Sequence, residues 1–421
     1  MKYSLLSRGV RRNMRKVPYY EGIHDYDKLS NTMFSLSLDQ KKSLDDVLTW
    51  YKKDRHAMPY VTLGGYAGTG KTTLIALLRT ELSKIDENLK VGFASYTGKA
   101  TRVLKSKLTA QNAIYKKDTV GTIHSLIYSP VTNDKEEIIG WQKKEKIDRN
   151  IIIIDEASMV DELIWTHLLS YHVPIIVVGD HGQLPPIKGD FNLMQKPDLL
   201  LEEIHRQAQE NPIIGISIQA RQTGIIAPGK YSNYVIKYAS GDIDGQEAMQ
   251  EMLTNYSSDT LILCGYNKTR KKLNNFIRNA KGIESSVPIK GDRVICLRNN
   301  HKKGIYNGMQ GTIVDIRQED PEWYRAEIAM DGESRNYKGL ISVEQFNSDT
   351  ALNFTAQRSK IMQGDLFDYG YALTVHKAQG SQARKVILLE ERFRQMSDED
   401  YKRWLYTAVT RAEEELYIFS Q

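Results

Sequence analysis

The sequence predicts an α/β protein in which strands and helices alternate around two sheets, and three observations support this class. Residues 151–154 and 175–178 are unbroken runs of β-branched residues. Such runs are typical of strands buried on both faces of a parallel sheet. These runs and other short strands alternate with helical segments, which indicates a doubly wound domain. The alternation starts again near residue 260, so a second α/β unit follows the first.

The first unit is predicted over residues 35–210. It begins with a helix at 37–51, whose apolar residues fall near one face. The elements that follow are a strand at 61–63, a helix at 72–82, a strand at 91–95, a helix at 99–108, and the strands at 151–154 and 175–178.

The second unit is predicted as two segments, 211–287 and 366–421, separated by an all-β insert at 288–365. Its elements are a strand at 261–263, a helix at 269–280, strands at 386–389 and 416–419, and a helix at 398–411 that Ser397 would cap. The strand-like segments of the insert are 292–296, 311–316 and 324–329, with turn signals at Asn307-Gly308 and Asp331-Gly332.

The composition is that of an ordinary globular protein with a mild excess of positive charge. The 421 residues include 58 Lys and Arg against 52 Asp and Glu, a net charge of +6. This excess suits a polyanionic partner. No apolar run approaches the roughly 20 residues that span a bilayer. The two cysteines, Cys264 and Cys296, form neither a disulfide framework nor a zinc pattern, so we expect a reducing compartment.

The N-terminal extension, residues 1–34, starts with a basic stretch. Residues 1–16 contain six Lys or Arg and no acidic residue. Three interpretations are open: a targeting peptide, a nucleic-acid-binding arm, or a frayed basic tail.

A phosphate-binding loop is the most specific local feature. Residues 65–72, G-Y-A-G-T-G-K-T, fit G-x-x-x-x-G-K-[ST] and lie between a predicted strand and a predicted helix, which a chance glycine-rich turn would not explain. Backbone N–H groups of such a loop surround phosphates, and the helix N-terminus adds positive potential. We expect Lys71 to reach the β- and γ-phosphates and Thr72 to ligate Mg²⁺. The predicted nucleotide-binding residues here are Gly65, Tyr66, Ala67, Gly68, Thr69, Gly70, Lys71, Thr72 and Thr73.

Two adjacent acids, Asp155 and Glu156, follow the isoleucine strand. A carboxylate at the end of a buried strand is costly to desolvate, and Mg²⁺ held between Asp155 and Thr72 would offset that cost. Glu156 would then orient or deprotonate the attacking water. A simple acidic loop is the alternative interpretation. Two adjacent acids favour hydrolysis over transfer to a second substrate.

From about residue 38 to the C-terminus, the chain resembles the superfamily 1 helicases, specifically the RecD and Dda-like branch that moves 5′ to 3′. The segments that carry the resemblance are T-G-K-A at 97–100, T-I-H at 122–124, D-E-A-S-M at 155–159, G-D-H-G-Q-L-P-P at 179–186, R-Q at 206–207, Y-A-L-T-V-H-K-A-Q-G-S at 371–381 and W-L-Y-T-A-V-T-R-A at 404–412. Ser95 and Tyr96 depart from the family pattern A-P-T-G-K-A, and Gln382 stands where many relatives have glutamate.

The resemblance implies two RecA-like domains with ATP in the cleft between them. Arg411 would approach the γ-phosphate from the second domain, and Arg206 would do so from the edge of the first. Gln183 would sense the γ-phosphate or its water, Gln40 would pair with the adenine edge, and Gly380 would contact the nucleotide. The alternatives are surface salt bridges for the arginines, a turn residue for Gln183 and a solvated helix residue for Gln40.

The resemblance also implies a track for single-stranded nucleic acid across both domains. The expected contacts are Thr97, Lys99, Thr122 and His124 from the first domain, and Thr374, His376 and Lys377 from the second. The alternative for both histidines is a core position that satisfies a loop.

Two further parts follow from the resemblance. A β-hairpin pin that splits the duplex is expected as an insert at about 127–149, where Trp141 would stack on a base or merely cover its own hairpin. The all-β insert at 288–365 resembles a small SH3-like barrel.

The sequence thus predicts an ATP- and Mg²⁺-dependent DNA helicase that moves 5′ to 3′, in replication, recombination or repair. A translocase that strips proteins from single strands, and a nucleic-acid clamp switched by ATP, are the alternatives. The expected partners are single-stranded DNA, single-strand/duplex junctions, and single-strand-binding or replisome proteins. We expect a monomer that has no membrane partner and works in the cytoplasm of a bacterium or a phage-infected host.

Overall fold

The computed structural model describes residues 36–132, 138–186, 191–204, 210–298, 300, 303–333, 335–346, 348, 352 and 363–420. The unit from Ser37 onward holds both predicted α/β domains and the insert. The predicted N-terminal extension at 1–34 and Arg206 lie outside the described residues. Within the described part, no helix combines the length and apolar character that crossing a membrane requires.

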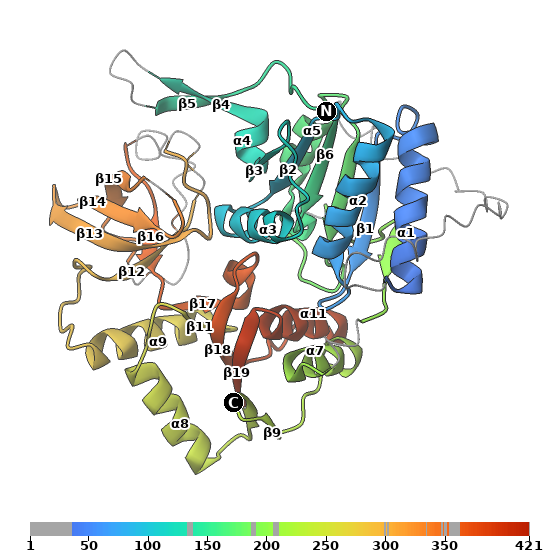
Figure 1. The fold of residues 1–421 in the computed structure, drawn as a ribbon. Coiled ribbons are helices and arrows are strands. Elements are labelled where there is room, and N and C mark those ends of the chain that lie inside the picture. The colour runs from blue at the N-terminus through green and yellow to red at the C-terminus, as the bar shows by residue number, and fades with distance from the viewer. Residues whose placement is uncertain are drawn as a thin grey trace. The chain divides into compact units, whose positions relative to one another are not determined.

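The first sheet has six parallel strands and confirms the α/β class (Figure 1). Its order is β3 (Thr119–Thr122), β2 (Val91–Ser95), β6 (Ile151–Asp155), β7 (Ile175–Gly179), β1 (Tyr60–Gly65) and β8 (Leu199–Leu201). The isoleucines of β6 are fully buried, as their unbroken run predicted. The polar residues that follow β1 and β6 therefore leave the sheet at the same carboxyl edge.

Helices cover this sheet and position its loops. The helices in chain order are α1 (Leu38–Thr49), α2 (Lys71–Ile85), α3 (Gly98–Ala110), α4 (Ile123–Ile127) and α5 (Glu162–Leu169). Ser37 caps α1 in a reciprocal pair with Gln40, which explains where that helix starts. After Thr49 the chain continues as one π-helical segment, Trp50–Asp54.

A two-stranded hairpin rises from the end of α4. It pairs β4 (Tyr128–Thr132) with β5 (Ile138–Lys143) in antiparallel register, and the backbone of Trp141 lies opposite Pro130. Figure 1 shows this ribbon extending away from the first sheet. The side chain of Trp141 lies outside the described part of the chain, so its role in strand separation stays a prediction.

The second sheet is also mainly parallel. Its order is β17 (Ala372–Thr374), β11 (Thr260–Cys264), β18 (Ala383–Glu390), β19 (Ala412–Ser420), β10 (Val235–Tyr238) and β9 (Gly229–Ser232), of which only β9 runs antiparallel to its neighbour. The helices α7 (Pro212–Thr223) and α11 (Asp398–Val409) share one apolar core with this sheet. The helix α9 (Asn267–Ala280) belongs to a separate core cluster with other residues of the same strands, and α8 (Ile243–Thr254) packs beside it.

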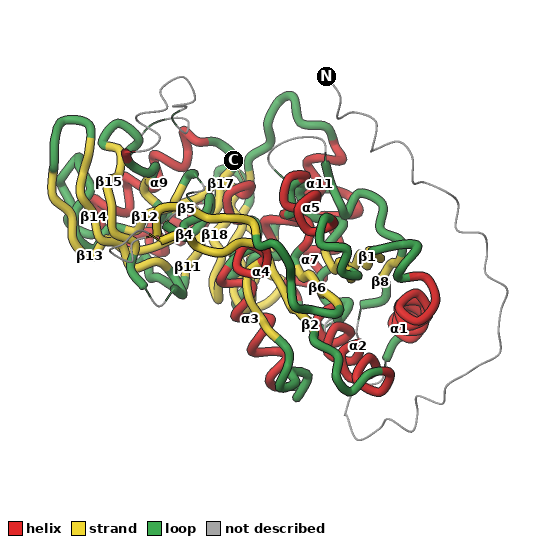
Figure 2. The backbone as a smooth tube through the Cα atoms, turned by 90° about the horizontal axis from the view of Figure 1, so that it is seen from above, coloured by secondary structure: helices red, strands yellow, loops and turns green. Residues whose placement is uncertain are grey.

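The insert forms a five-stranded antiparallel sheet with its own core. Its order is β15 (Tyr337–Ser342), β14 (Trp323–Met330), β13 (Gln310–Gln318), β12 (Arg293–Cys296) and β16 (Phe367–Tyr369). β16 pairs with β12, whereas β17, three residues later, pairs with β11 of the second sheet. The chain therefore returns to the second sheet through Gly370 and Tyr371. In Figure 2 the insert and α1 lie at opposite ends of this unit. The likeness to an SH3 barrel stays a prediction.

Candidate functional site

The loop between β1 and α2 has the backbone of a phosphate cradle. Gly70 precedes α2 with a φ of +73°, a left-handed conformation that favours glycine. The Lys71 ammonium donates to the carbonyls of Gly65 and Tyr66 at 2.8 Å each and lies 4.0 Å from Asp180. These carbonyls are weaker partners for an ammonium than a phosphate is, so Lys71 can exchange them for a nucleotide.

Gln40 lies directly against this loop. Its side chain is fully buried; Nε2 donates to Thr69 O at 2.9 Å, and Oε1 accepts from Ser37 N at 3.1 Å. The Gln40 amide therefore holds the phosphate loop in place through its bond to the Thr69 carbonyl. Its predicted contact with adenine would require an exchange of at least one of these bonds and stays a prediction.

The acid pair lies at the carboxyl end of β6. Asp155 Oδ1 accepts from the Glu156 backbone N–H at 2.9 Å, and Glu156 has a left-handed φ of +55° that turns the chain sharply. Burial, together with the neighbouring Glu156, raises the pKa of Asp155 to about 6. Glu156 Oε2 is buried and has no hydrogen-bond partner among the described residues. Two crowded carboxylates with an unsatisfied oxygen fit a divalent cation and a water.

One pocket brings the acids together with residues of the second sheet. Thr72, Asp155 and Glu156 line it from the first domain. Gly380, Gln382 and Arg411 line it from the second, and α3 supplies Lys99, Ala100, Val103, Leu104 and Lys107. Thr72, the two acids and Arg411, which were predicted from separate motifs, thus line one space, whereas Lys71 is not among its lining residues.

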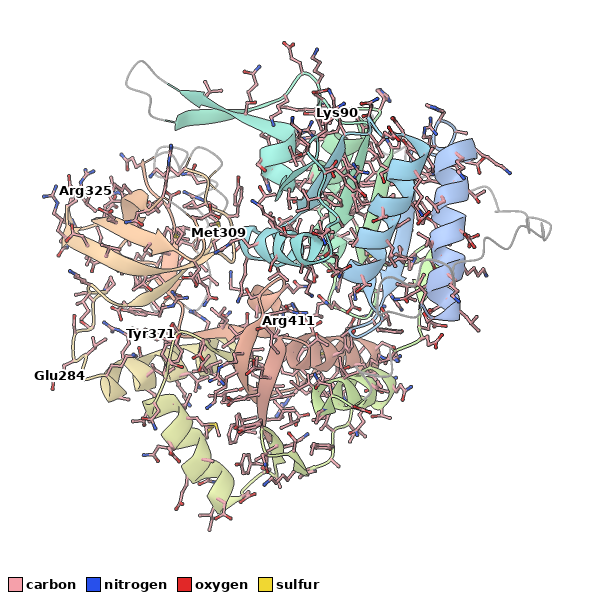
Figure 3. The ribbon with its side chains drawn as sticks, viewed as in Figure 1. Lys90, Glu284, Met309, Arg325, Tyr371 and Arg411 are labelled. Carbon is pink, nitrogen blue, oxygen red and sulfur yellow. The ribbon has the colours of Figure 1, made fainter. Side chains whose placement is uncertain are left out.

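Arg411 is fixed by its own domain. Its side chain is almost fully buried; Nε donates to Thr407 O at 3.0 Å, Nη1 to Ser381 O at 3.2 Å and Nη2 to Thr410 Oγ1 at 3.2 Å. Figure 3 labels it beside α11. A guanidinium with three restraints moves little relative to its domain, so its distance from the acids depends on how the two domains sit together.

The loop after β7 connects the domains. Asp180 accepts from Gly182 N at 3.0 Å, from Gln183 Nε2 at 3.2 Å and from the Tyr406 hydroxyl at 2.7 Å. The other amide atom of Gln183, Oε1, is buried and has no partner within the described residues. Gln183 is not a lining residue of the pocket that holds the acids, and its role as a phosphate sensor stays a prediction.

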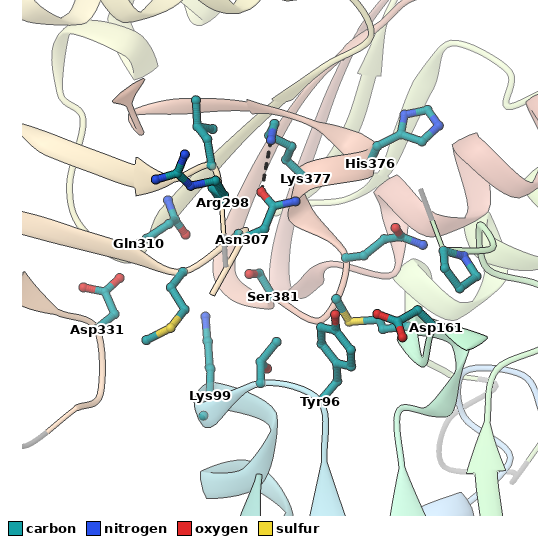
Figure 4. A pocket seen from close by; sticks show the side chains of 18 of the residues that line it. Tyr96, Lys99, Asp161, Arg298, Asn307, Gln310, Asp331, His376, Lys377 and Ser381 are labelled. Carbon is teal, nitrogen blue, oxygen red and sulfur yellow. Dashed lines mark hydrogen bonds between the residues drawn. The ribbon is translucent and has the colours of Figure 1, made fainter. Parts of the chain in front are cut away.

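A separate cavity of about 310 Å³ lies where the first domain, the insert and the second domain meet (Figure 4). Its lining includes Tyr96, Thr97 and Lys99, then Arg298, Asn307 and Asp331 of the insert, and His376, Lys377 and Ser381. Thr97, Lys99, His376 and Lys377 are four of the predicted strand contacts. Lys99 also lines the pocket that holds Asp155 and Glu156, so the pocket and the cavity are adjacent.

Three of the basic side chains that line this cavity, Lys99, Lys377 and His376, have different surroundings. The Lys99 ammonium donates to the backbone carbonyl of Gln382, and burial lowers its pKa. Lys377 donates to Asn307 Oδ1 at 3.2 Å, a bond drawn in Figure 4. Burial also lowers the pKa of His376, which favours the neutral ring at pH 7.

Three other predicted strand contacts lie outside the cavity lining. His124 is 2% exposed and packs in a cluster of rings, with its centroid 4.3 Å from that of Tyr306 in the insert and 5.7 Å from that of Tyr128. Thr122 caps α4 by accepting from Ser125 N at 3.1 Å, and Thr374 is buried at the end of β17. Their contact with nucleic acid stays a prediction.

Sequence reasoning assigned no role to Tyr406 or Thr407, although both lie inside the segment W-L-Y-T-A-V-T-R-A that it singled out. A polar pair among apolar residues, four and five positions before an arginine of interest, was the available signal. Only the folded chain reveals that this face of α11 meets another domain.

Two family models and several known proteins are similar to this chain. Residues 53–188 match the AAA domain family and residues 369–419 the UvrD-like helicase C-terminal domain. The chain is 27% identical to the ATP-dependent RecD2 DNA helicase of Deinococcus radiodurans, over 85% of this chain and 46% of that protein. It is 28% identical to the ATP-dependent DNA helicase Dda of Enterobacteria phage T4, over 59% of this chain and 57% of that protein.

A solved structure of Pif1 helicases at forked DNA has a TM-score of 0.47 and 18% identity, over 91% of this chain and 92% of that one. The chain thus spans about half the length of these two curated relatives.

Proposed function

We propose that this chain is a superfamily 1B helicase of the RecD, Dda and Pif1 type, an ATP-driven motor that moves 5′ to 3′ on single-stranded DNA and unwinds duplex. One observation carries the proposal. The pocket that holds Asp155 and Glu156 (the acid pocket) and the cavity lined by four predicted strand contacts (the nucleic-acid cavity) lie side by side and share Lys99. Each is lined by residues of both α/β domains. A displacement of Lys99 therefore alters both spaces.

In the proposed reaction, Lys71 leaves the loop carbonyls to bind the β- and γ-phosphates of ATP. Thr72 and Asp155 are the residues that would hold Mg²⁺, which when bound neutralises charge on these phosphates. Glu156, with its unsatisfied oxygen, accepts a proton from the attacking water. Arg411 stabilises the charge that develops on the transferred group. In the same proposal, Arg206 supplies a second cation, Gln183 senses the γ-phosphate, and Gln40, Thr73 and Gly380 contact the nucleotide.

Movement follows from the different attachments of the two domains. Thr97 and Lys99 lie on one domain, and His376 and Lys377 on the other, along one cavity. When the domains close around ATP, the distance between these two pairs of strand contacts becomes shorter. When the domains open after hydrolysis, this distance becomes longer again. Alternating grip then moves the chain along the strand, while the hairpin and Trp141 meet the duplex at a single-strand/duplex junction.

A tailed-duplex assay tests the direction of movement. Duplexes with a 5′ tail, a 3′ tail or blunt ends are incubated with the protein, ATP and Mg²⁺. We expect unwinding of the 5′-tailed duplex only, and its loss in Lys71→Ala. Unwinding from the 3′ tail alone would contradict the polarity. DNA-stimulated ATPase without any unwinding would favour a translocase that displaces proteins.

A further inference from the structure

The hydroxyl of Tyr406 occupies a position that couples the phosphate loop to the second domain. It accepts a hydrogen bond from Ala67 N–H at 2.7 Å and donates one to Asp180 Oδ2 at 2.7 Å. Ala67 belongs to the phosphate loop, Asp180 to the loop after β7, and Tyr406 to α11. One side-chain oxygen thus joins three elements of two domains.

The environment keeps this hydroxyl in one chemical state. Tyr406 is fully buried, and burial together with the adjacent Asp180 carboxylate raises the pKa of its phenol well above the usual range. The group is therefore protonated at neutral pH and can donate to Asp180. Its ring packs edge-on against Tyr66 with centroids 6.0 Å apart. Removal of the oxygen alone would leave this ring packing in place.

Neighbouring bonds attach the same helix to the same loop. Thr407 Oγ1 accepts from Leu184 N at 2.9 Å, one residue after Tyr406. Gln379, beside the nucleic-acid cavity, donates to Leu184 O at 2.6 Å. The loop after β7 is therefore held both by α11 and by the segment that borders the cavity.

Arg411 lies five residues after Tyr406, and its Nε donates to the carbonyl of Thr407. The guanidinium is thus anchored to the part of α11 that Tyr406 and Thr407 dock on the first domain. Because Arg411 lines the pocket with Asp155 and Glu156, the docking of α11 sets where the cation stands relative to the acids.

We propose that Tyr406 is a positioning residue for hydrolysis: its hydroxyl docks α11 on the phosphate loop and on Asp180, and thereby places Arg411 at the reacting phosphate. This inference rests on the proposed ATP-driven function. ATP is still bound by Lys71 and Thr72 when the hydroxyl is absent, because both groups belong to the first domain.

The test compares Tyr406→Phe with a matched control, Tyr401→Phe, in steady-state ATPase assays with and without single-stranded DNA. Tyr401 is on the same helix, and its hydroxyl donates to Glu390 within the second domain at 3.1 Å. We expect Tyr406→Phe to lower kcat by about tenfold while KM for ATP changes less than about threefold, the loss for one buried bond to a charged group. Tyr401→Phe should keep the wild-type kcat.

A double-mutant cycle with Arg411→Ala separates positioning from a structural role. If Tyr406 acts through Arg411, Tyr406→Phe should lower kcat little further in the Arg411→Ala background. Losses that multiply, or a Tyr406→Phe enzyme that matches Tyr401→Phe, would overturn the inference. A wild-type protein with no DNA-stimulated ATPase would instead overturn the proposed function. Melting temperatures of all variants confirm that they fold.

Discussion

At the scale of single residues, the candidate site contains two acidic side chains that lie close together, one of them with an unsatisfied oxygen. Asp155 and Glu156 are adjacent acids at the end of one buried strand, and an oxygen of Glu156 has no partner among the described residues. The sequence was sufficient to place both acids at the end of a buried strand and Lys71 at the start of the helix after β1, because each follows a recognisable strand or loop. It was not sufficient for Tyr406, whose partners lie 226 and 339 positions away in the chain.

Glu156→Gln should separate nucleotide binding from hydrolysis. The amide keeps the shape of the side chain but cannot accept a proton from water, so kcat should fall by about 100-fold or more. The affinity for a fluorescent ATP analogue should stay close to that of the wild type. Glu162→Gln, an exposed acid at the start of α5, is the control. A Glu156→Gln enzyme with wild-type kcat would remove Glu156 from the proposed mechanism.

Asp155 should make the nucleotide-free protein less stable as pH rises. Its pKa of about 6 lies above the ordinary pKa of an aspartate, 3.8, so the folded state binds more protons between about pH 4 and 6. The free energy of unfolding therefore falls as pH rises through this window. Asp155→Asn removes this cost and should raise the melting temperature at pH 7 but have little effect at pH 4. A stabilisation that is equal at both pH values would contradict this account.

At the scale of elements, local sequence patterns predicted most of the strands and helices that surround the site. β2 was predicted residue for residue, and Ser397 caps α11 by accepting from Asp400 N at 3.1 Å. The elements α7, α8, β9 and β10 were not predicted. Local signals for the two helices were present but not used: Asn211 and Asp242 cap their starts, and Gly224 ends α7 in a left-handed conformation. The strands β9 and β10 have four residues each, too few for a clear apolar alternation.

Ser397→Ala should destabilise the start of α11 without changing the chemistry. Loss of an N-cap oxygen costs about 1 kcal/mol, which lowers the melting temperature by a few degrees at most. Ser397→Thr, which keeps the hydroxyl, should remain near the wild type. Because Tyr406 and Arg411 lie at the other end of the helix, kcat should not change. A large loss of kcat in Ser397→Ala would indicate that the helix moves as a whole.

At the scale of the whole described unit, three bodies surround one cavity, and this arrangement was only partly predictable. Thr97, Lys99, His376 and Lys377 were predicted from their motifs, and all four line it. The insert's contribution, which includes Arg298, Asn307 and Asp331, was not predicted. No motif marks these residues, because the fold of the insert alone brings them to the cavity.

Lys377→Ala should weaken binding to single-stranded DNA in a salt-dependent way. Removal of one phosphate contact should reduce the slope of log Kd against log salt by about 0.7. Fluorescence anisotropy with an oligothymidylate at several salt concentrations measures this slope. Lys385→Ala is the control: this lysine is on β18, lies 3.8 Å from Glu415 of β19 and is not part of the cavity lining. An unchanged slope in Lys377→Ala would place the strand elsewhere.

The pairing of β12 with β16 has a consequence for how this molecule can vary. The insert begins and ends on two strands that are hydrogen-bonded neighbours, so its entry and its exit lie side by side. Because the two connections between the insert and the second sheet lie next to each other, the insert can be exchanged, enlarged or removed without a change in the strand order of that sheet. The insert is therefore a suitable place to introduce a different surface beside the cavity that the three bodies surround, with α9 and β17 as the connections.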